Sequence, residues 1–401
     1  MKLAGSDAHL TYCTNIHPGE SWAEVRANIS THVVAVKARV SPDAPFGVGL
    51  RLSARAAEEL REPRELAAFA ELLKTSGLYV FTINGFPYGA FHVARVKEQV
   101  YLPDWRDPAR TRYSTCLAEI LAALLPAGMT GSVSTVPGAF RSAIASERTA
   151  GEDTARMVDE LVAHAAALVR LLDTTGKEIV LALEPEPMCF LETSHEAVRF
   201  FEEHLFGGDA RSRLAALTGL GPARAEESLR RHLGVCFDAC HVAVEFEDAR
   251  ASLDALERAG IAIAKIQITT ALEAQVDGAL RHELTRFADD VYLHQVVALQ
   301  DGKLARYLDL PEALERAPDG LWRIHFHVPV FQRELGSFQN TQPHLRDVLA
   351  VVRERGVSKH LEIETYTWDV LPEALRAGDA VSAIAAEIEW TRAELARRSD
   401  P

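Results

Sequence analysis

The sequence lacks the features that secreted and membrane-spanning proteins depend on. Its 401 residues include only five cysteines, an odd and scattered set that does not suit a disulfide framework. No run of about 18 apolar residues is present, so no helical membrane span is expected. The first ten residues, MKLAGSDAHL, contain no apolar core of a signal peptide. We therefore expect a cytoplasmic location.

Positive charge is also scarce. Lys and Arg number 43 against 57 Asp and Glu, which gives a net charge of −14. Such a balance opposes binding to a phosphate backbone or an anionic membrane surface. Cys236 and Cys240 are close in sequence, but no second pair completes a structural zinc site. We expect a small molecule as the partner, and no nucleic acid.

What is present is a regular alternation of short apolar segments with longer amphipathic ones. Residues 153–172, for example, carry apolar side chains at helical spacing. Repeated strand–helix units predict a parallel α/β fold, and eight of them close a (β/α)8 TIM barrel. We predict one such barrel over residues 1–401. Nine segments are typical of strands: residues 9–15, 48–53, 78–84, 131–136, 178–184, 233–238, 264–269, 323–328 and 360–365.

One predicted strand is therefore extra, or belongs to an insertion. We expect insertions at residues 85–112, 207–232 and 279–312, the last with a hairpin turn at residues 300–302. If segment 323–328 lies in the barrel, its His327 should point at the mouth. If it pairs with the hairpin outside the barrel, we expect a structural role for His327.

Several predicted strands have one apolar face and one face that becomes polar toward the C-terminal end. This pattern predicts a polar site at the C-terminal mouth of the barrel. The alternative, a one-sided antiparallel sheet facing water, fits the helical connections less well. The strand ends supply Glu184, Asp238, Glu364 and either His327 or Gln267.

These oxygen and nitrogen donors suit Mn²⁺, Mg²⁺ or Zn²⁺. Clustered acids repel one another, and a divalent cation removes that repulsion. Other readings stay open: Glu184 pairs with Lys265 or Arg51, Asp238 only caps a helix, or the histidines belong to the core. Candidates for contact with the substrate are Asn15, His17, Asn84, His241, Lys265, His325, Tyr366 and Trp368.

The order of these motifs resembles a known superfamily. Glu184 in LALEPEP, Asp238 and His241 in FDACH, and Glu364 in LEIETYTW resemble the xylose-isomerase-like TIM barrels. The blocks LTYCTNIHPGESW, RIHFHVPVF and HLEIETYTWDVLP resemble, more closely, the EboE family of metabolite traffic proteins. The superfamily resemblance implies a divalent metal on Glu184, Asp238 and Glu364, with His241 near the substrate. It departs at Gln267, where sugar epimerases usually place a metal-binding histidine.

We expect a metal-dependent isomerase or epimerase that acts on a small metabolite. Glu184 and Glu364 would exchange the proton as base and acid. The EboE resemblance implies partners from one metabolite traffic system and a substrate that is sugar-like, phosphorylated or prenyl-linked. Two alternatives are a metal-dependent phosphoester hydrolase and a non-catalytic carrier.

Overall fold

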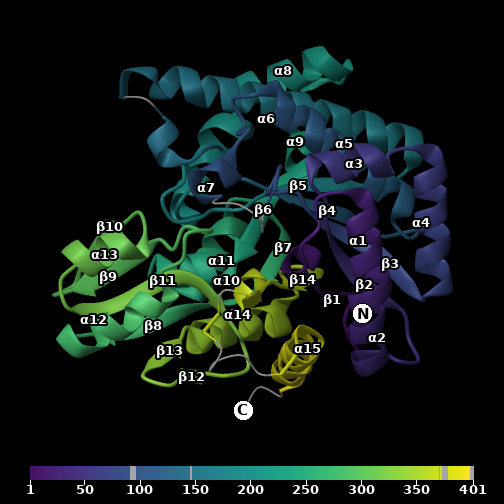
Figure 1. Cartoon of the computed structure of the whole chain (residues 1–401). Helices are drawn as coiled ribbons and strands as arrows, with labels where there is room; N and C mark the ends of the chain where they lie inside the picture. The colour runs from purple at the N-terminus through teal and green to yellow at the C-terminus, as the bar shows by residue number, and fades with distance from the viewer. Residues whose placement is uncertain (91–95, 145–146, 370, 373–377, 398–401) are drawn as a thin grey trace.

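The computed structural model describes residues 1–90, 96–144, 147–369, 371–372 and 378–397, without the side chains of 147–149 and 368–369. Its centre is a sheet of eight parallel strands in the order β1-β14-β7-β6-β5-β4-β3-β2 (Figure 1). The sheet curls into a nearly closed TIM barrel with helices interleaved between the strands. The strands are β1 (His9–Tyr12), β2 (Phe46–Arg51), β3 (Leu78–Asn84), β4 (Gly131–Thr135), β5 (Ile179–Leu183), β6 (Leu233–Asp238), β7 (Ala262–Ile268) and β14 (His360–Ile363).

Hydroxyl side chains join the two edges of this sheet. Cys13 and Gly49 form a single parallel bridge between the β1 end and β2. Thr11 Oγ1 donates to the Gly47 carbonyl over 2.7 Å and accepts from the Gly49 amide over 3.0 Å. Thr14 Oγ1 accepts from the Arg51 amide over 2.9 Å. Threonine oxygens thus replace part of the backbone ladder at the β1–β2 seam.

The barrel interior is polar and tightly filled. Thr82, Ser132 and His360 form a chain of hydrogen bonds of 2.8 Å across its lower part. Above them, Lys265 Nζ lies 2.5 Å from Glu362 Oε2 with both side chains fully buried. A Cβ at Gly49 would lie 1.9 Å from Glu362 Oε1, so glycine makes the room for this pair.

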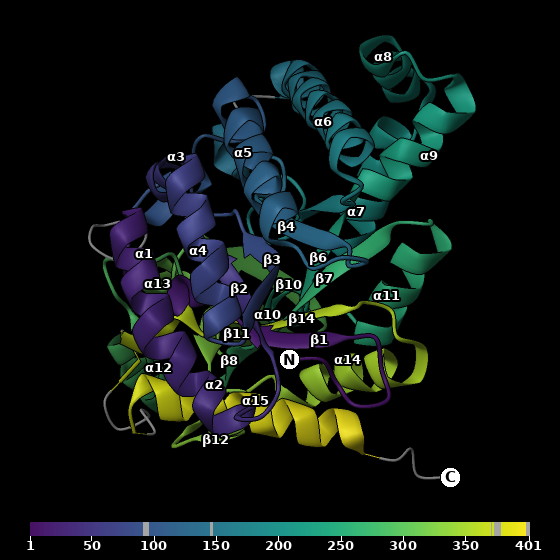
Figure 2. The ribbon, with the colours of Figure 1, turned by 90° about the vertical axis from the view of Figure 1, so that its right-hand side faces the viewer.

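Helices cover the outside of the barrel, as Figure 2 shows from the side. Many begin with side-chain caps: Ser21 and Thr193 form capping boxes, and Asp107 and Asp248 accept from first-turn amides. The helices are α1 (Trp22–Asn28), α2 (Val34–Val40), α3 (Ala54–Leu60), α4 (Pro63–Thr75), α5 (Pro108–Leu124), α6 (Glu147–Thr175), α7 (Ser194–Phe200), α8 (Gly208–Thr218), α9 (Pro222–His232), α10 (Ala239–Val244), α11 (Ala249–Arg258), α14 (Gln342–Arg355) and α15 (Ala380–Ala396). Short helical turns are η1 (Thr14–Ile16), η2 (Ile29–Val33), η3 (Lys97–Tyr101), η4 (Arg141–Ala143), η5 (Phe201–Leu205) and η7 (Tyr366–Asp369).

A second sheet, six-stranded and antiparallel, lies beside the barrel (green in Figure 1). It has the order β10-β9-β11-β8-β13-β12 and begins one residue after β7. The sheet extends well beyond the predicted insertion at 279–312, whereas the predicted insertion at 207–232 contains α8 and α9. Its strands are β8 (Thr270–Val276), β9 (Val296–Gln300), β10 (Lys303–Tyr307), β11 (Gly320–Val328), β12 (Glu334–Leu335) and β13 (Phe338–Asn340), with α12 (Gly278–Leu284), η6 (Thr285–Phe287) and α13 (Leu310–Arg316) between them.

The extra predicted strand is β11. It pairs with β8 and with hairpin strand β9, outside the barrel. The hairpin turn of β9 and β10 lies at Asp301 and Gly302, both at positive φ. In the described part of the chain, no helix is long and apolar enough to cross a membrane.

Candidate metal centre at the barrel mouth

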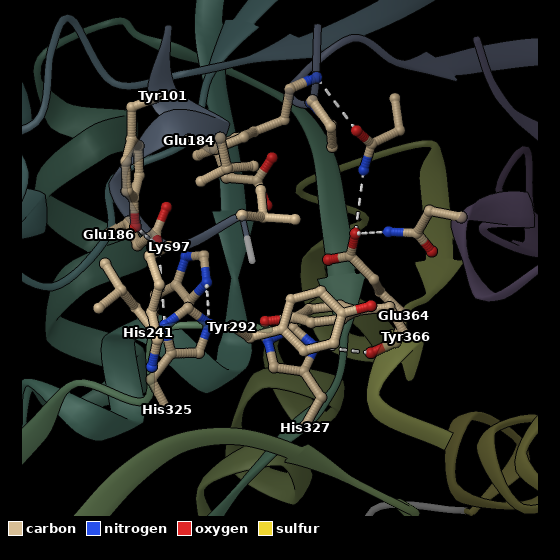
Figure 3. Close-up of a pocket in the computed structure, with 17 residues that line it drawn as sticks. Lys97, Tyr101, Glu184, Glu186, His241, Tyr292, His325, His327, Glu364 and Tyr366 are labelled. Atoms are coloured by element: carbon tan, nitrogen blue, oxygen red, sulfur yellow. Dashed lines mark hydrogen bonds and ion pairs between the residues drawn. The ribbon is translucent and has the colours of Figure 1, made fainter. Parts of the chain in front are cut away.

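A pocket opens at the C-terminal ends of the barrel strands, between the barrel and the second sheet (Figure 3). The cavity volume is about 70 Å³, so the pocket is narrow. Carboxylates and histidines form its floor, and aromatic rings form much of its wall. Its aromatic lining residues are Phe86, Tyr101, Tyr292 and Tyr366.

Three acids from different barrel strands converge at the floor. One carboxylate oxygen each from Glu184, Asp238 and Glu364 lies within 4.8 Å of the other two. Glu184 follows β5, Asp238 ends β6 and Glu364 follows β14, so all three stand at the same end of the barrel. Their relative exposures are 2%, 1% and 5%, which leaves little water to screen the repulsion. The strand-end spacing in the sequence predicted this convergence.

Glu364 is held in place by two amide groups. Asn15 Nδ2 and Asn84 Nδ2 donate to Glu364 Oε1 over 2.7 and 2.9 Å. Asn15 comes from η1 after β1, and Asn84 ends β3. Both residues were predicted to contact the substrate. The structure shows both residues in the pocket lining, where they fix the orientation of the carboxylate through Oε1 and make no bond to Oε2.

Asp238 caps a helix and still offers an oxygen to the cluster. Its Oδ1 accepts from the amides of Cys240 and His241, over 2.6 and 3.1 Å, at the start of α10. Its Oδ2 is buried and has no hydrogen-bond partner among the described residues. The same holds for Glu184 Oε2. The cap reading is therefore correct for one oxygen and leaves the other available to a cation.

Burial and mutual repulsion change how these acids ionise. Burial, then the charges of Glu364 and Asp238, raise the pKa of Glu184 well above its usual range. Burial, then Asp238 and Glu362, do the same to the pKa of Glu364. Burial raises the pKa of Asp238 only to about 6, because His327 and the helix amides oppose it. A divalent cation would offset the cost that these shifts express.

The ion-pair alternative for Glu184 is wrong in this structure. Lys265 pairs with Glu362, one layer deeper in the barrel, and its Nζ also lies 3.5 Å from Ser134 Oγ. Arg51 pairs with Glu20 over 3.1 Å and donates to the Gly19 and Gly89 carbonyls. Lys265 is fully buried beneath the pocket rather than in its lining, which does not suit the predicted contact with substrate.

His327 lies on a strand that pairs with the hairpin outside the barrel, and it still lines the pocket at the mouth, a combination that neither predicted alternative included. Its Nδ1 lies 2.8 Å from the Glu364 carbonyl, and one of its ring nitrogens groups with Asp238 and His241. The physical reason is a change of register in β11 between Ile324 and His327, where the strand crosses the mouth. Figure 3 shows His327 beside Glu364 and Tyr366.

Two further histidines line the same floor. His241, from α10, places Nδ1 2.9 Å from the Pro185 carbonyl. His325, from β11, places Nδ1 2.7 Å from Gln295 Oε1. The Nε2 atom of His325 lies 3.1 Å from that of His241 and 3.2 Å from that of His327.

The remaining predicted site residues lie at different distances from the pocket. Gln267 is buried beside Asp238 in the β6–β7 register, and neither atom of its amide group has a hydrogen-bond partner among the described residues. His17 bonds to Tyr12 and stacks on His32, outside the pocket lining. Tyr366 lines the pocket. The side chain of Trp368 lies outside the described residues.

Sequence patterns missed some residues at and beside the pocket, which come from η3 and from the segment before β9. Gln295 Nε2 donates to Tyr101 Oη over 3.0 Å, and Tyr101 Oη donates to Glu186 Oε1 over 2.6 Å. Burial raises the pKa of Glu186 to about 8, although the Tyr101 hydrogen bond opposes this. Tyr292 and Lys97 also line the pocket. Gln295 precedes β9 and has no recognisable motif around it.

No protein-family model matches the chain, and no curated protein sequence matches it. Among solved structures, it is similar to the probable 3-DHS dehydratase AsbF, involved in petrobactin synthesis, from Bacillus anthracis (13% identity, TM-score 0.45, covering 95% of this chain and 97% of that one). It is similar to an IOLI protein with a binding zinc atom (14%, TM-score 0.46, 96% and 97%). A third is a xylose isomerase domain protein from Alicyclobacillus acidocaldarius (13%, TM-score 0.44, 97% and 98%).

Proposed function

We propose that this protein is a metal-dependent isomerase or epimerase of a small polyhydroxy-carbonyl metabolite. The observation that carries the proposal is the convergence of Glu184, Asp238 and Glu364 within 4.8 Å in a buried floor. Two of the three acids keep a buried oxygen without a hydrogen-bond partner among the described residues. Such oxygens are costly to bury unless a cation neutralises them.

The donors fit a divalent cation of the Mn²⁺, Mg²⁺ or Zn²⁺ class. Glu184, Asp238 and Glu364 would hold it, and the amide oxygen of Gln267 is the best placed further donor on the adjacent strand. When bound, the cation supplies an electrophile that polarises a substrate carbonyl.

Glu184 and Glu364 divide the proton transfer in this proposal. Glu184 Oε2 has no hydrogen-bond partner among the described residues and takes the proton from the carbon next to the carbonyl. Glu364, fixed by Asn15 and Asn84, returns a proton to the neighbouring carbon in an isomerase, or to the opposite face in an epimerase. Burial and the neighbouring acids raise the pKa of both groups, which makes each a better proton acceptor than an exposed carboxylate.

The pocket wall supports a sugar-like substrate. Tyr366 and Tyr292 contact each other with ring centroids 5.2 Å apart, and Tyr101 stacks on Phe140 at 4.5 Å. Aromatic rings offer an apolar face and a polar edge, which suits a ring with C–H and O–H groups. The narrow floor favours a small metabolite over a polymer.

We also propose membership of the EboE family. Its three matching blocks are far apart in sequence, yet Asn15 of the first block and His327 of the second each hydrogen-bond Glu364 of the third. This meeting supports a shared site in that family. It would make the small metabolite an intermediate of one metabolite traffic system.

Phosphoester hydrolysis is the second candidate. The nitrogen donors beside the carboxylates favour it, because hydrolases of this kind use two cations about 3.5–4 Å apart. A non-catalytic carrier is the third candidate, and it predicts binding without turnover.

Isotope exchange tests the proposal without knowledge of the natural substrate. The metal-reconstituted protein is incubated in D₂O with a panel of aldoses, ketoses and their phosphates, and deuterium at the α-carbon is followed by NMR. We expect exchange that chelator abolishes and that Glu184→Gln and Glu364→Gln lower by about 10²–10⁴-fold. The exposed Glu334→Gln is the matched control. Phosphate release in place of exchange supports the hydrolase, and metal-independent binding without either supports the carrier.

A further inference from the structure

The second acid of the LALEPEP segment, Glu186, lines the pocket but has no part in the carboxylate group or in the proton transfer. It stands between two prolines, whose rings restrict the backbone on either side, and it is 5% exposed. Figure 3 shows Glu186 and Tyr101 on one side of the pocket, with Glu364 and Tyr366 on the other. Glu186 is therefore placed to contact a part of the substrate that lies away from Glu364.

One oxygen of Glu186 is occupied by the protein itself. Tyr101 Oη donates to Oε1 over 2.6 Å, and Gln295 Nε2 lies 3.4 Å from the same atom. Gln295 Nε2 also lies 3.3 Å from the Pro187 carbonyl, which can only accept, so this atom is the amide nitrogen. Because that nitrogen donates to Tyr101 Oη over 3.0 Å, the single hydroxyl proton of Tyr101 is left for Glu186.

The other oxygen of Glu186 has no such partner. Oε2 makes no hydrogen bond to the described residues, yet it is not one of the sealed, unpartnered oxygens, as Glu184 Oε2 and Asp238 Oδ2 are. It therefore faces the open space of the pocket that Glu186 lines. A carboxyl group whose first oxygen is held by two donors presents its second oxygen to a ligand in a defined direction.

The two donors to Oε1 come from separate parts of the fold and are themselves held in place. Tyr101 ends η3, is 2% exposed and stacks on Phe140 with ring centroids 4.5 Å apart. Gln295 precedes β9 of the second sheet, is 1% exposed, and its Oε1 lies 2.7 Å from His325 Nδ1. Buried and hydrogen-bonded side chains have little further freedom to lose when a ligand binds, so Glu186 is preorganised.

We infer that Glu186 is a specificity-determining residue, which recognises a hydroxyl group of the substrate through Oε2. The inference rests on the proposed function for the class of substrate, a small polyhydroxy-carbonyl compound, and it names the residue that distinguishes one such compound from another. A hydroxyl group both donates and accepts, so it pairs with Glu186 whether or not the carboxyl group is ionised. An analogue without this hydroxyl leaves the fixed oxygen facing carbon, and a site built for a hydroxyl group rejects such analogues.

Binding of polyhydroxy probes tests the inference without any need for turnover. The aldoses and ketoses of the isotope-exchange panel, each with its monodeoxy analogues, are titrated into the metal-reconstituted full chain by calorimetry. For one hydroxyl position, we expect the deoxy analogue to bind the wild type about 10–100-fold more weakly than its parent. That difference should vanish in Glu186→Leu and persist in Glu186→Gln, which keeps a polar atom in both positions. The exposed Glu98→Leu, from the same η3 segment as Tyr101, is the matched control and should keep the full difference.

The outcomes separate this inference from the proposed function. A deoxy penalty that vanishes in Glu186→Leu supports the inference even if no isotope exchange occurs, in which case only the proposed function fails. Isotope exchange in the wild type, with the same deoxy penalties in Glu186→Leu, overturns the inference and preserves the proposed function. Loss of bound metal from Glu186→Gln, or no binding of any probe to the wild type, also overturns the inference. If circular dichroism shows that Glu186→Leu does not fold, Glu186→Ala provides the same readout.

Discussion

Buried acidic side chains form two layers in the same barrel. Only the lower layer is paired with a basic side chain, Lys265. Glu362 and Glu364 lie two residues apart near the end of β14. Glu362 lies 2.5 Å from Lys265 Nζ, whereas Glu364 lies among Glu184 and Asp238 and is held by neutral amides. In the lower layer, the charge of Glu362 is neutralised by Lys265. In the proposed function, an added cation neutralises the upper layer.

The presence or absence of a basic partner thus distinguishes acids that stabilise the fold from acids that are available to a ligand. No comparison with related proteins is needed to make this distinction. In a buried ion pair the two opposite charges neutralise each other, so neither side chain is available to bind a ligand. A buried group of like charges is unstable alone and gains most from a ligand of opposite charge. The following substitutions test the comparison, from the largest expected effect to the smallest.

Breaking the lower pair should cost the most stability. Lys265→Met leaves Glu362 fully buried without its partner, and we expect a loss of about 3–5 kcal/mol in the free energy of unfolding. The loss should be larger with chelator than with metal, because the charge of Lys265 also lowers the pKa of Glu184, Asp238 and Glu364 and so reduces their repulsion. Urea unfolding measures it.

The double variant Lys265→Met/Glu362→Leu is the control for this prediction. Removing both charges should restore most of the stability. A loss below about 1 kcal/mol in Lys265→Met would show that the lower layer is not held by this pair.

Glu387 is a buried acid of another kind, because its hydrogen-bond partners among the described residues are neutral donors and not charged side chains. Glu387, on α15, accepts from Thr365 Oγ1 over 2.8 Å and from the Val330 amide over 3.2 Å. Burial raises its pKa to about 7. The folded state therefore holds the proton more tightly than the unfolded state between pH 4.5 and 7. The contribution to stability is full below about pH 4.5 and is lost as the pH rises through 7.

This loss amounts to about 3 kcal/mol, since each pKa unit corresponds to about 1.36 kcal/mol. The measurement is urea unfolding with chelator from pH 4.5 to 8, for the wild type and Glu387→Gln. The difference between the two profiles should fall with rising pH. Parallel profiles would mean that Glu387 ionises normally.

The smallest change in stability is expected at the upper layer. Glu364→Gln keeps an oxygen for Asn15 and Asn84 and removes one of three clustered charges. In chelator, the variant should be as stable as the wild type or more so, by up to about 1 kcal/mol. Added Mn²⁺ or Zn²⁺ should raise its melting temperature less than that of the wild type. A large destabilisation in chelator would instead place Glu364 with Glu362 as a structural acid.

The barrel strands were predictable because their patterns are local. Strands β3 and β6 have the predicted bounds, 78–84 and 233–238, since each is an apolar run that ends at an Asn or Asp. The carboxylate group was predictable for the same reason: parallel strand ends meet at one rim.

The second sheet was only partly predictable, because its strands depend on distant partners. Strand β8 follows β7 after a single residue, Thr269, with no turn signal between them. Its pairing with β11 joins residues about fifty positions apart. The mouth position of His327 and the contact of His325 with Gln295 follow from that pairing, and no local pattern encodes either.

The seam between β1 and β2 has a consequence for hydrogen exchange. Neighbouring barrel strands are joined by backbone ladders, whereas the amides of Gly49 and Arg51 donate to threonine hydroxyls. A hydroxyl rotates away more readily than a backbone carbonyl, so local opening at this seam costs less than opening elsewhere. Asn15, which holds Glu364, follows the strand on one side of the seam. We therefore expect local opening of this seam to limit how long the Glu364 carboxylate stays aligned. Deuterium uptake at the amides of Gly49 and Arg51 measures how often the seam opens.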